Sequence, residues 1–177
     1  MATYDLDEQE RLDELKAWWK RWGNLVMVGL AVVVAAAAGW RYWQNQVVTQ
    51  SLEAATVYEQ LTRSLAANDA KAARDAGAML IDQYKGTAYA PRAALLLAKL
   101  NVGAKDLKSA QAQLEWAVAN SKEPAVKDLA RLRLAGVQLD QKQYDAALKT
   151  LSATHSDAFA FRFHDLKGDV LLAQGKQ

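Results

Sequence analysis

Residues 22–40 read WGNLVMVGLAVVVAAAAGW, a stretch of 19 residues without a charged side chain. As an α-helix it would span about 28 Å at about 1.5 Å per residue, close to the hydrocarbon thickness of a bilayer. Aromatic residues that favour the membrane–water interface flank both ends: Trp18, Trp19 and Trp22 before it, and Trp40, Tyr42 and Trp43 after it. The stretch is therefore predicted to be a transmembrane helix.

Two other structures could carry such a stretch. A buried helix of a soluble domain would rarely have tryptophans at both ends. A signal peptide could be cleaved next to the small residues Ala36 and Ala38. However, residues 1–21 are rich in acids and the apolar run is longer than a typical signal core. We favour a membrane anchor.

The orientation of the anchor is predicted from lysines and arginines, which are enriched on the cytoplasmic side. Four basic residues closely precede the stretch and one follows within the next 20 residues: Arg11, Lys16, Lys20 and Arg21, then Arg41. We expect a cytoplasmic tail over residues 1–21, a transmembrane helix over 22–40 and a domain on the far side over 41–177. Within the span, Ala31, Ala35 and Gly39 recur every four residues. Such a stripe of small residues favours close packing of another transmembrane helix, although alanine could also simply fill the span.

Beyond Trp43, apolar residues recur at helical spacing, and turn residues interrupt them at short intervals. The fold class is therefore predicted to be all-α, with paired antiparallel helices. A period of 37 residues relates three sets of positions: Ala73, Ala110 and Ala147; Leu61, Ala98 and Ala135; Gly77, Leu114 and Leu151. These are the spacings of a tetratricopeptide-like solenoid of helical hairpins with longer loops. Gly168 would lie in a last repeat that looks incomplete. A generic helical bundle is the alternative.

Residue types that carry chemistry are sparse. The chain has no cysteine, and its two histidines, His155 and His164, are not spaced as metal ligands on one helix. No glycine-rich phosphate loop or nucleophile motif is present. The net charge is only +2, which does not indicate a nucleic-acid partner. We expect a protein-interaction module that is not an enzyme and uses no metal or cofactor.

Several segments carry a family resemblance: residues 39–43 (GWRYW), 132–135 (LRLA), 145–151 (DAALKTL) and 165–168 (DLKG). With the acidic tail, the anchor and the repeats, the chain resembles the ancillary SecYEG translocon subunit family over essentially its whole length. The resemblance implies a bacterial inner-membrane protein with a periplasmic repeat domain. It also implies association with the Sec translocon and with a membrane-anchored periplasmic chaperone of prolyl-isomerase type, and a link to an envelope-stress regulator.

Two functions follow as hypotheses. In the first, the chain is an adaptor that assists protein export and binds translocating polypeptides in a concave groove formed by the first helix of each pair. The tetratricopeptide frame places these residues in the groove: Tyr58, Thr62, Arg92, Leu95, Leu96, Lys99, Leu129, Leu132, Arg133, Gly136, Arg162, Asp165 and Asp169. In the second, the acidic tail sequesters a cytoplasmic DNA-binding regulator through Asp5, Asp7, Glu8, Glu10, Asp13 and Glu14.

Overall fold

The computed structural model describes the backbone of residues 4–175 and the side chains of residues 12–175. The described residues form helices and no strand: α1 (Tyr4–Ala66), α2 (Ala70–Gln83), α3 (Tyr89–Gly103), α4 (Leu107–Asn120), α5 (Pro124–Asp140), α6 (Tyr144–Leu151) and α7 (Asp157–Ala173). The chain divides into two compact units, residues 1–48 and 49–177. The predicted all-α class is confirmed.

The first unit consists of the N-terminal part of α1, which in the described residues is the helix long and apolar enough to cross a membrane. Trp18, Trp22, Trp40 and Trp43 are exposed along it, as interfacial side chains of a single-pass anchor would be. The helix is continuous from Tyr4 to Ala66, so no helix end marks the predicted domain limits at residues 21 and 40. Those limits stay predictions.

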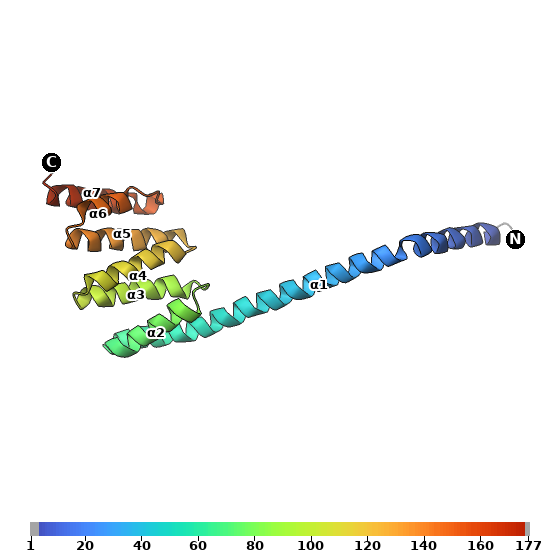
Figure 1. Cartoon of the computed structure of the whole chain (residues 1–177), viewed down its shortest axis with the longest axis horizontal. Coiled ribbons are helices and arrows are strands. Elements are labelled where there is room, and N and C mark those ends of the chain that lie inside the picture. The colour runs from blue at the N-terminus through green and yellow to red at the C-terminus, as the bar shows by residue number, and fades with distance from the viewer. Residues whose placement is uncertain (1–3, 176–177) are drawn as a thin grey trace. The chain divides into compact units, whose positions relative to one another are not determined.

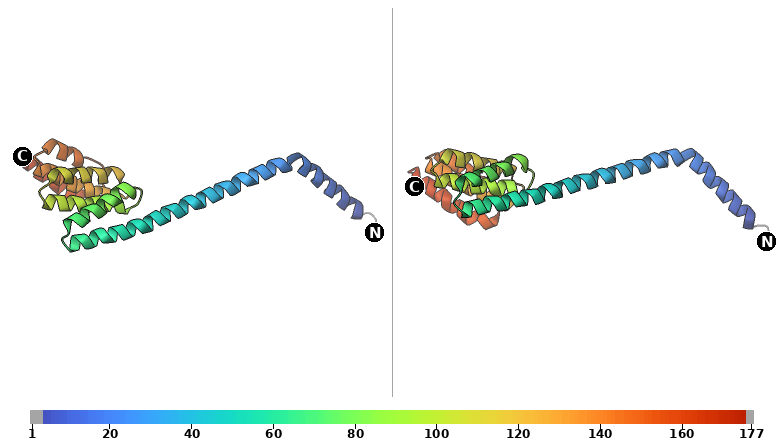
Figure 2. Two further views of the ribbon diagram at one scale, coloured as in Figure 1. Left: turned by 60° about the horizontal axis from the view of Figure 1, so that its bottom comes forward. Right: turned by 90° about the horizontal axis from the view of Figure 1, so that it is seen from below.

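In the second unit, three antiparallel pairs follow one another: the end of α1 with α2, α3 with α4, and α5 with α6; α7 comes after the third pair. Figure 1 shows α2 to α7 stacked in chain order, and Figure 2 shows the same helices from two further sides. Each of these helices packs against the next, and α5 also packs directly against both α3 and α7. Consequently α3, α5 and α7 are neighbours in one layer, while α4 and α6 lie between them in the chain.

A repeated turn joins the two helices of each pair. Asn68, Lys105 and Lys142 have φ angles of 57°, 60° and 60°, the left-handed conformation that commonly ends a helix. The following backbone N–H donates to a carbonyl five residues earlier in all three turns: Asp69 to Ser64, Asp106 to Asn101 and Gln143 to Gln138, at 2.8–2.9 Å. These turns lie 37 residues apart, so the period of the sequence is also a period of the backbone.

Side chains at the turns also fix where the second helices begin. The Asp69 carboxylate accepts hydrogen bonds from the backbone N–H groups of Lys71 and Ala72 at the start of α2. Asp106 accepts one from the Ser109 N–H at the start of α4, at 3.0 Å. A capping carboxylate stabilises a helix because it satisfies N–H groups that have no partner within the helix.

The core runs through the second unit as three clusters of buried side chains, one for each junction between neighbouring pairs. Small residues lie where helices cross: Ala73, Ala110 and Ala147 are fully buried. At Gly77 of α2 the approach is closer still, because a Cβ built there would lie 2.7 Å from Leu97 Cγ of α3. A glycine at this position therefore allows α2 and α3 to pack together.

A buried carboxylate attaches the last helix to α5. Asp128 is only 3% exposed. Its Oδ2 accepts hydrogen bonds from the Ser156 backbone N–H at 3.0 Å and from the Ser156 hydroxyl at 2.9 Å. Arg131 donates to Asp128 Oδ1 at 3.3 Å and to the Thr154 carbonyl at 2.7 Å. Asp128 is therefore paired on both oxygens, and it holds the segment that leads into α7.

Candidate functional site

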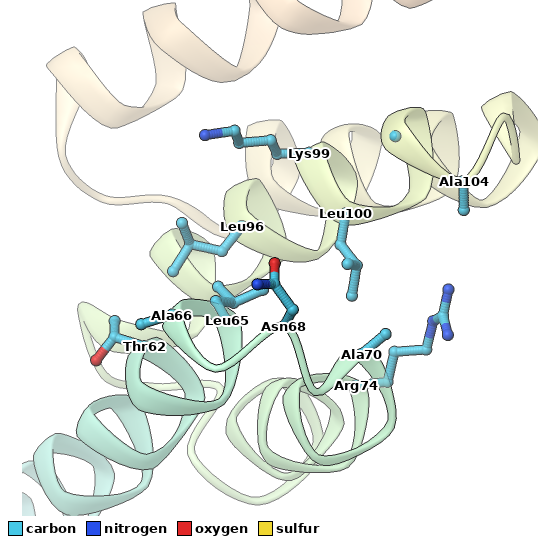
Figure 3. A pocket seen from close by; sticks show the side chains of 11 residues that line it. Thr62, Leu65, Ala66, Asn68, Ala70, Arg74, Leu96, Lys99, Leu100 and Ala104 are labelled. Atoms are coloured by element: carbon cyan, nitrogen blue, oxygen red, sulfur yellow. The ribbon is translucent and has the colours of Figure 1, made fainter.

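Two hollows open beside the first helices of the repeat domain, and both include Lys99 of α3. The first has a volume of about 760 Å³ and lies between the end of α1, the start of α2 and α3 (Figure 3). Its lining residues are Thr62, Leu65, Ala66, Asn68, Ala70, Arg74, Leu96, Lys99, Leu100, Gly103 and Ala104. In Figure 3, Leu96 and Leu100 extend from α3 toward the turn between α1 and α2, with Lys99 and Arg74 at the edge.

The second hollow has a volume of about 400 Å³ and lies between α3, α4 and α5. Its lining residues are Ala98, Lys99, Val102, Leu114, Arg133, Gly136, Val137 and Asp140. Lys99 therefore stands between the two hollows and belongs to the wall of each. We call them the first and the second pocket.

The basic residues at the two pockets differ in how far acidic residues of the domain already compensate their charge. Lys99 is exposed and takes part in none of the ion pairs found among residues 12–175. Arg74 has an acidic neighbour: hydrogen bonds from the Ser109 side chain and backbone N–H lower the pKa of Asp106, and the positive charge of Arg74 lowers it further. Lys99 is consequently the cation at the pockets with the least internal compensation.

Two arginines predicted for the groove make contacts within the domain. Arg92 of α3 forms an ion pair with Glu123 at 2.8 Å, next to the start of α5. Arg133 of α5 donates to the Leu95 carbonyl of α3 at 3.3 Å. Both side chains link neighbouring pairs, so a substitution at either position would disturb the domain as well as any partner contact.

The remaining predicted groove residues are spread over several environments. Leu96 and Lys99 line the first pocket, whereas Leu95 is 5% exposed and belongs to the core. Tyr58 is half-buried, with its ring centroid 5.3 Å from that of Tyr89. Leu129 is partly buried against the core cluster of α3, α4 and α5. On α7, three predicted residues are exposed and line neither pocket: Arg162, Asp165 and Asp169.

The predicted membrane stripe lies in the first unit, on α1. Ala31, Ala35 and Gly39 are all exposed there, and a Cβ built at Gly39 would meet no atom within 4 Å. The stripe is thus open to another helix. Of the acidic tail, Asp13 and Glu14 are exposed, while the side chains of Asp5, Asp7, Glu8 and Glu10 lie outside the described residues.

Of the eleven residues that line the first pocket, the sequence predicted Thr62, Leu96 and Lys99 and missed the other eight. The missed residues include Leu65, Asn68, Arg74 and Leu100. Asn68 and Arg74 come from the turn and from the second helix, so a prediction restricted to first helices could not include them. Leu65 carried a usable signal in the sequence, because it lies three residues after the predicted Thr62 and so on the same face of the first helix.

The described side chains offer no site for a metal ion, since no three of their His, Asp and Glu residues are placed to hold one. The expectations of no metal and no cofactor stay predictions. His155 instead stacks on the buried ring of Phe163, at a centroid distance of 4.4 Å. That contact is structural.

Comparison with known proteins identifies the family. A family model described as a tetratricopeptide repeat-like domain matches residues 16–177. The chain is 32% identical over 173 residues to the ancillary SecYEG translocon subunit of Haemophilus influenzae, covering 98% of this chain and 84% of that protein. The chain belongs to the ancillary SecYEG translocon subunit family.

Other members of the ancillary SecYEG translocon subunit family match over the same extent. The Escherichia coli protein of that name is 31% identical over 175 residues, and the Neisseria gonorrhoeae protein is 32% identical over 177 residues. Each alignment covers 99% of this chain and 84% of the relative. No solved structure matches the chain. The resemblance noted from the sequence is therefore confirmed, together with the tetratricopeptide-like class.

Proposed function

We propose that this chain is a non-enzymatic subunit of the Sec translocon in the bacterial inner membrane. The observation that carries the proposal is its identity of 31–32%, over nearly the whole chain, with proteins named for that assembly. The anchor holds the repeat domain at the membrane. Such tethering raises the effective concentration of the domain for polypeptides at the channel to roughly millimolar.

The finer part of the proposal concerns what the repeat domain does there. It lies on the periplasmic side, binds a membrane-anchored chaperone of prolyl-isomerase type or the emerging polypeptide, and so assists export. Two features support this role. The pockets beside Lys99 are lined mainly by apolar side chains, as protein-binding grooves are, and an exposed cation at their shared wall adds selectivity.

The direct test is purification of the tagged full-length chain from native membranes in a mild detergent, followed by mass spectrometry of the proteins retained. SecYEG subunits should be enriched many-fold over an unrelated single-pass inner-membrane protein expressed at the same level. Equal recovery from both preparations would contradict the association with the translocon. Recovery of SecYEG without a chaperone would contradict only the proposed contact with the chaperone.

Substitutions that enlarge the small-residue stripe should show whether the anchor or the repeat domain contacts SecYEG. We expect Ala35→Leu and Gly39→Leu to reduce co-purification of SecYEG several-fold, because leucine prevents the close approach of a second helix. Ala37→Leu is the matched control, since it makes the same change on the opposite face of α1. If all three variants retain SecYEG fully, the stripe faces lipid and the repeat domain makes the contact.

A further inference from the structure

The two pockets occupy equivalent places in the repeat. Adding 37 to Thr62, Leu65 and Ala66 of the first pocket gives Lys99, Val102 and Gly103, of which the first two line the second pocket. The same shift relates the opposite walls: Leu96, Lys99, Leu100 and Gly103 correspond to Arg133, Gly136, Val137 and Asp140. The structure thus presents one hollow twice, formed first by α1 with α3 and then by α3 with α5.

The spacing of the pockets follows from helix packing. Helices α3 and α5 are in direct contact, and packed helices have axes about 8–10 Å apart. One step of the repeat therefore moves a hollow by about 10 Å. An unfolded polypeptide in the polyproline II conformation advances about 3.1 Å per residue with three residues per turn, so side chains three positions apart point the same way and are about 9 Å apart.

The residues that line the two pockets determine which side chains of a bound polypeptide fit there. Leu65, Leu96 and Leu100 give the first pocket an apolar wall, and Val102, Leu114 and Val137 do the same in the second. Between the two lies Lys99, exposed and outside the ion pairs described above. An acidic side chain that reached this ammonium would gain an attraction, because no carboxylate among the described side chains forms an ion pair with Lys99, although Asp140 lines the same second pocket.

We propose that the two pockets bind one extended polypeptide segment, with apolar side chains at positions i and i+3 in the two hollows and an acidic residue between them facing Lys99. The inference rests on the proposed function and names the polypeptide that the domain selects. A partner with basic residues between its apolar side chains is disfavoured, because the walls carry three cations, Arg74, Lys99 and Arg133, and only one acid, Asp140.

The test measures fluorescence anisotropy of labelled peptides added to the full chain in lipid nanodiscs. The reference peptide carries leucines at i and i+3 and aspartates between them, within a Gly/Ser sequence. Its variants replace the aspartates with lysines, replace the leucines with serines, or place the leucines seven residues apart in a helix-forming sequence. We expect the reference peptide to bind at least tenfold tighter than each variant.

Two glycines allow each pocket to be filled separately. A Cβ at Gly103 or at Gly136 would meet no atom within 4 Å, and neither residue has a positive φ. Gly103→Phe and Gly136→Phe should therefore fold normally and each weaken binding of the reference peptide at least tenfold. Ala112→Phe, on the exposed face of α4 away from both pockets, is the control and should leave the affinity unchanged.

Reversing the charge tests the preference for an acid. Lys99→Glu should make the lysine peptide bind tighter than the aspartate peptide, whereas Lys85→Glu, at an exposed lysine outside the pockets, should not change the order. Circular dichroism melting confirms that the variants fold. The proposal is overturned if the wild-type protein does not distinguish aspartate from lysine, if both phenylalanine variants bind normally, or if the helical peptide binds best. Retention of SecYEG by the Gly103→Phe/Gly136→Phe variant reports on the proposed function independently of peptide binding.

Discussion

Replacing Phe163 with alanine should lower the free energy of unfolding of α7 by about 3–5 kcal/mol, the usual range for a buried phenylalanine. Phe163 is 2% exposed and belongs to the core cluster with Ala135, Ala147 and Leu151. Its removal leaves a cavity between α7 and the pair formed by α5 and α6. Because stability in a repeat protein is supplied largely by neighbouring units, the loss should appear first as local opening of the terminal helix.

The chain offers a matched control on the same helix. Phe161 is two residues away and 80% exposed, so Phe161→Ala should change stability by less than about 0.5 kcal/mol. Hydrogen–deuterium exchange of residues 157–173, with urea unfolding of the second unit, measures both effects. Similar protection of α7 in the two variants would show that Phe163 is not part of the core and that the packing of α7 has been misplaced.

Cysteine labelling that reports the topology of the anchor should give an all-or-none result. The chain contains no cysteine, so single-cysteine variants can be labelled without background. In intact spheroplasts, Ser152→Cys should react with a membrane-impermeant maleimide, whereas Glu14→Cys should react only after lysis. Both positions are exposed, and the four basic residues before the span predict a cytoplasmic tail.

A permeant maleimide serves as the control because it should label both cysteines in intact spheroplasts. The reverse pattern with the impermeant reagent would place the repeat domain in the cytoplasm. In that case the association with emerging polypeptides would be excluded, whereas the peptide specificity of the pockets could still be measured.

Much of the fold was predictable because its constraints act on single residues. A helix crossing requires a small side chain, so the repeated crossings leave a period in the sequence at Ala73, Ala110 and Ala147. The left-handed turns leave a weaker signal, because two of their three residues, Lys105 and Lys142, are not of a type that usually adopts this conformation. The turn residues Asn68 and Gly86, which interrupt the apolar pattern of the sequence, both fall between helices of the structure. The anchor was equally visible, because a bilayer imposes a length and excludes charge.

The candidate site was less predictable because it depends on contacts between residues far apart in the chain. Arg92 and Glu123 are 31 positions apart, and their ion pair follows from how one loop meets the next pair. Arg133 reaches the Leu95 carbonyl across 38 positions. The frame could place these arginines on first helices, but it could not show that their guanidinium groups are already engaged.

The burial of Asp128 was also unforeseen. In the sequence it resembles any acidic residue on a solvated helix face. Its role arises only when the segment before α7 folds back over α5 and Ser156 donates two hydrogen bonds to its carboxylate. A polar residue whose partners come from a later loop leaves no periodic signal.

The order of the helices gives the groove a direction. Thr62, Lys99 and Gly136 occupy the same repeat position on α1, α3 and α5. On α7 the aligned residue is Asp169, if Ala130 and Val137 of α5 are matched with the buried Phe163 and Val170. Along this position the residues are neutral, cationic, without a side chain and acidic in turn, so Lys99 and Asp169 are separated by two steps of the series. A segment lying along these helices is therefore not equivalent to the same segment reversed: it fits best with its acidic end over α3 and its basic end over α7.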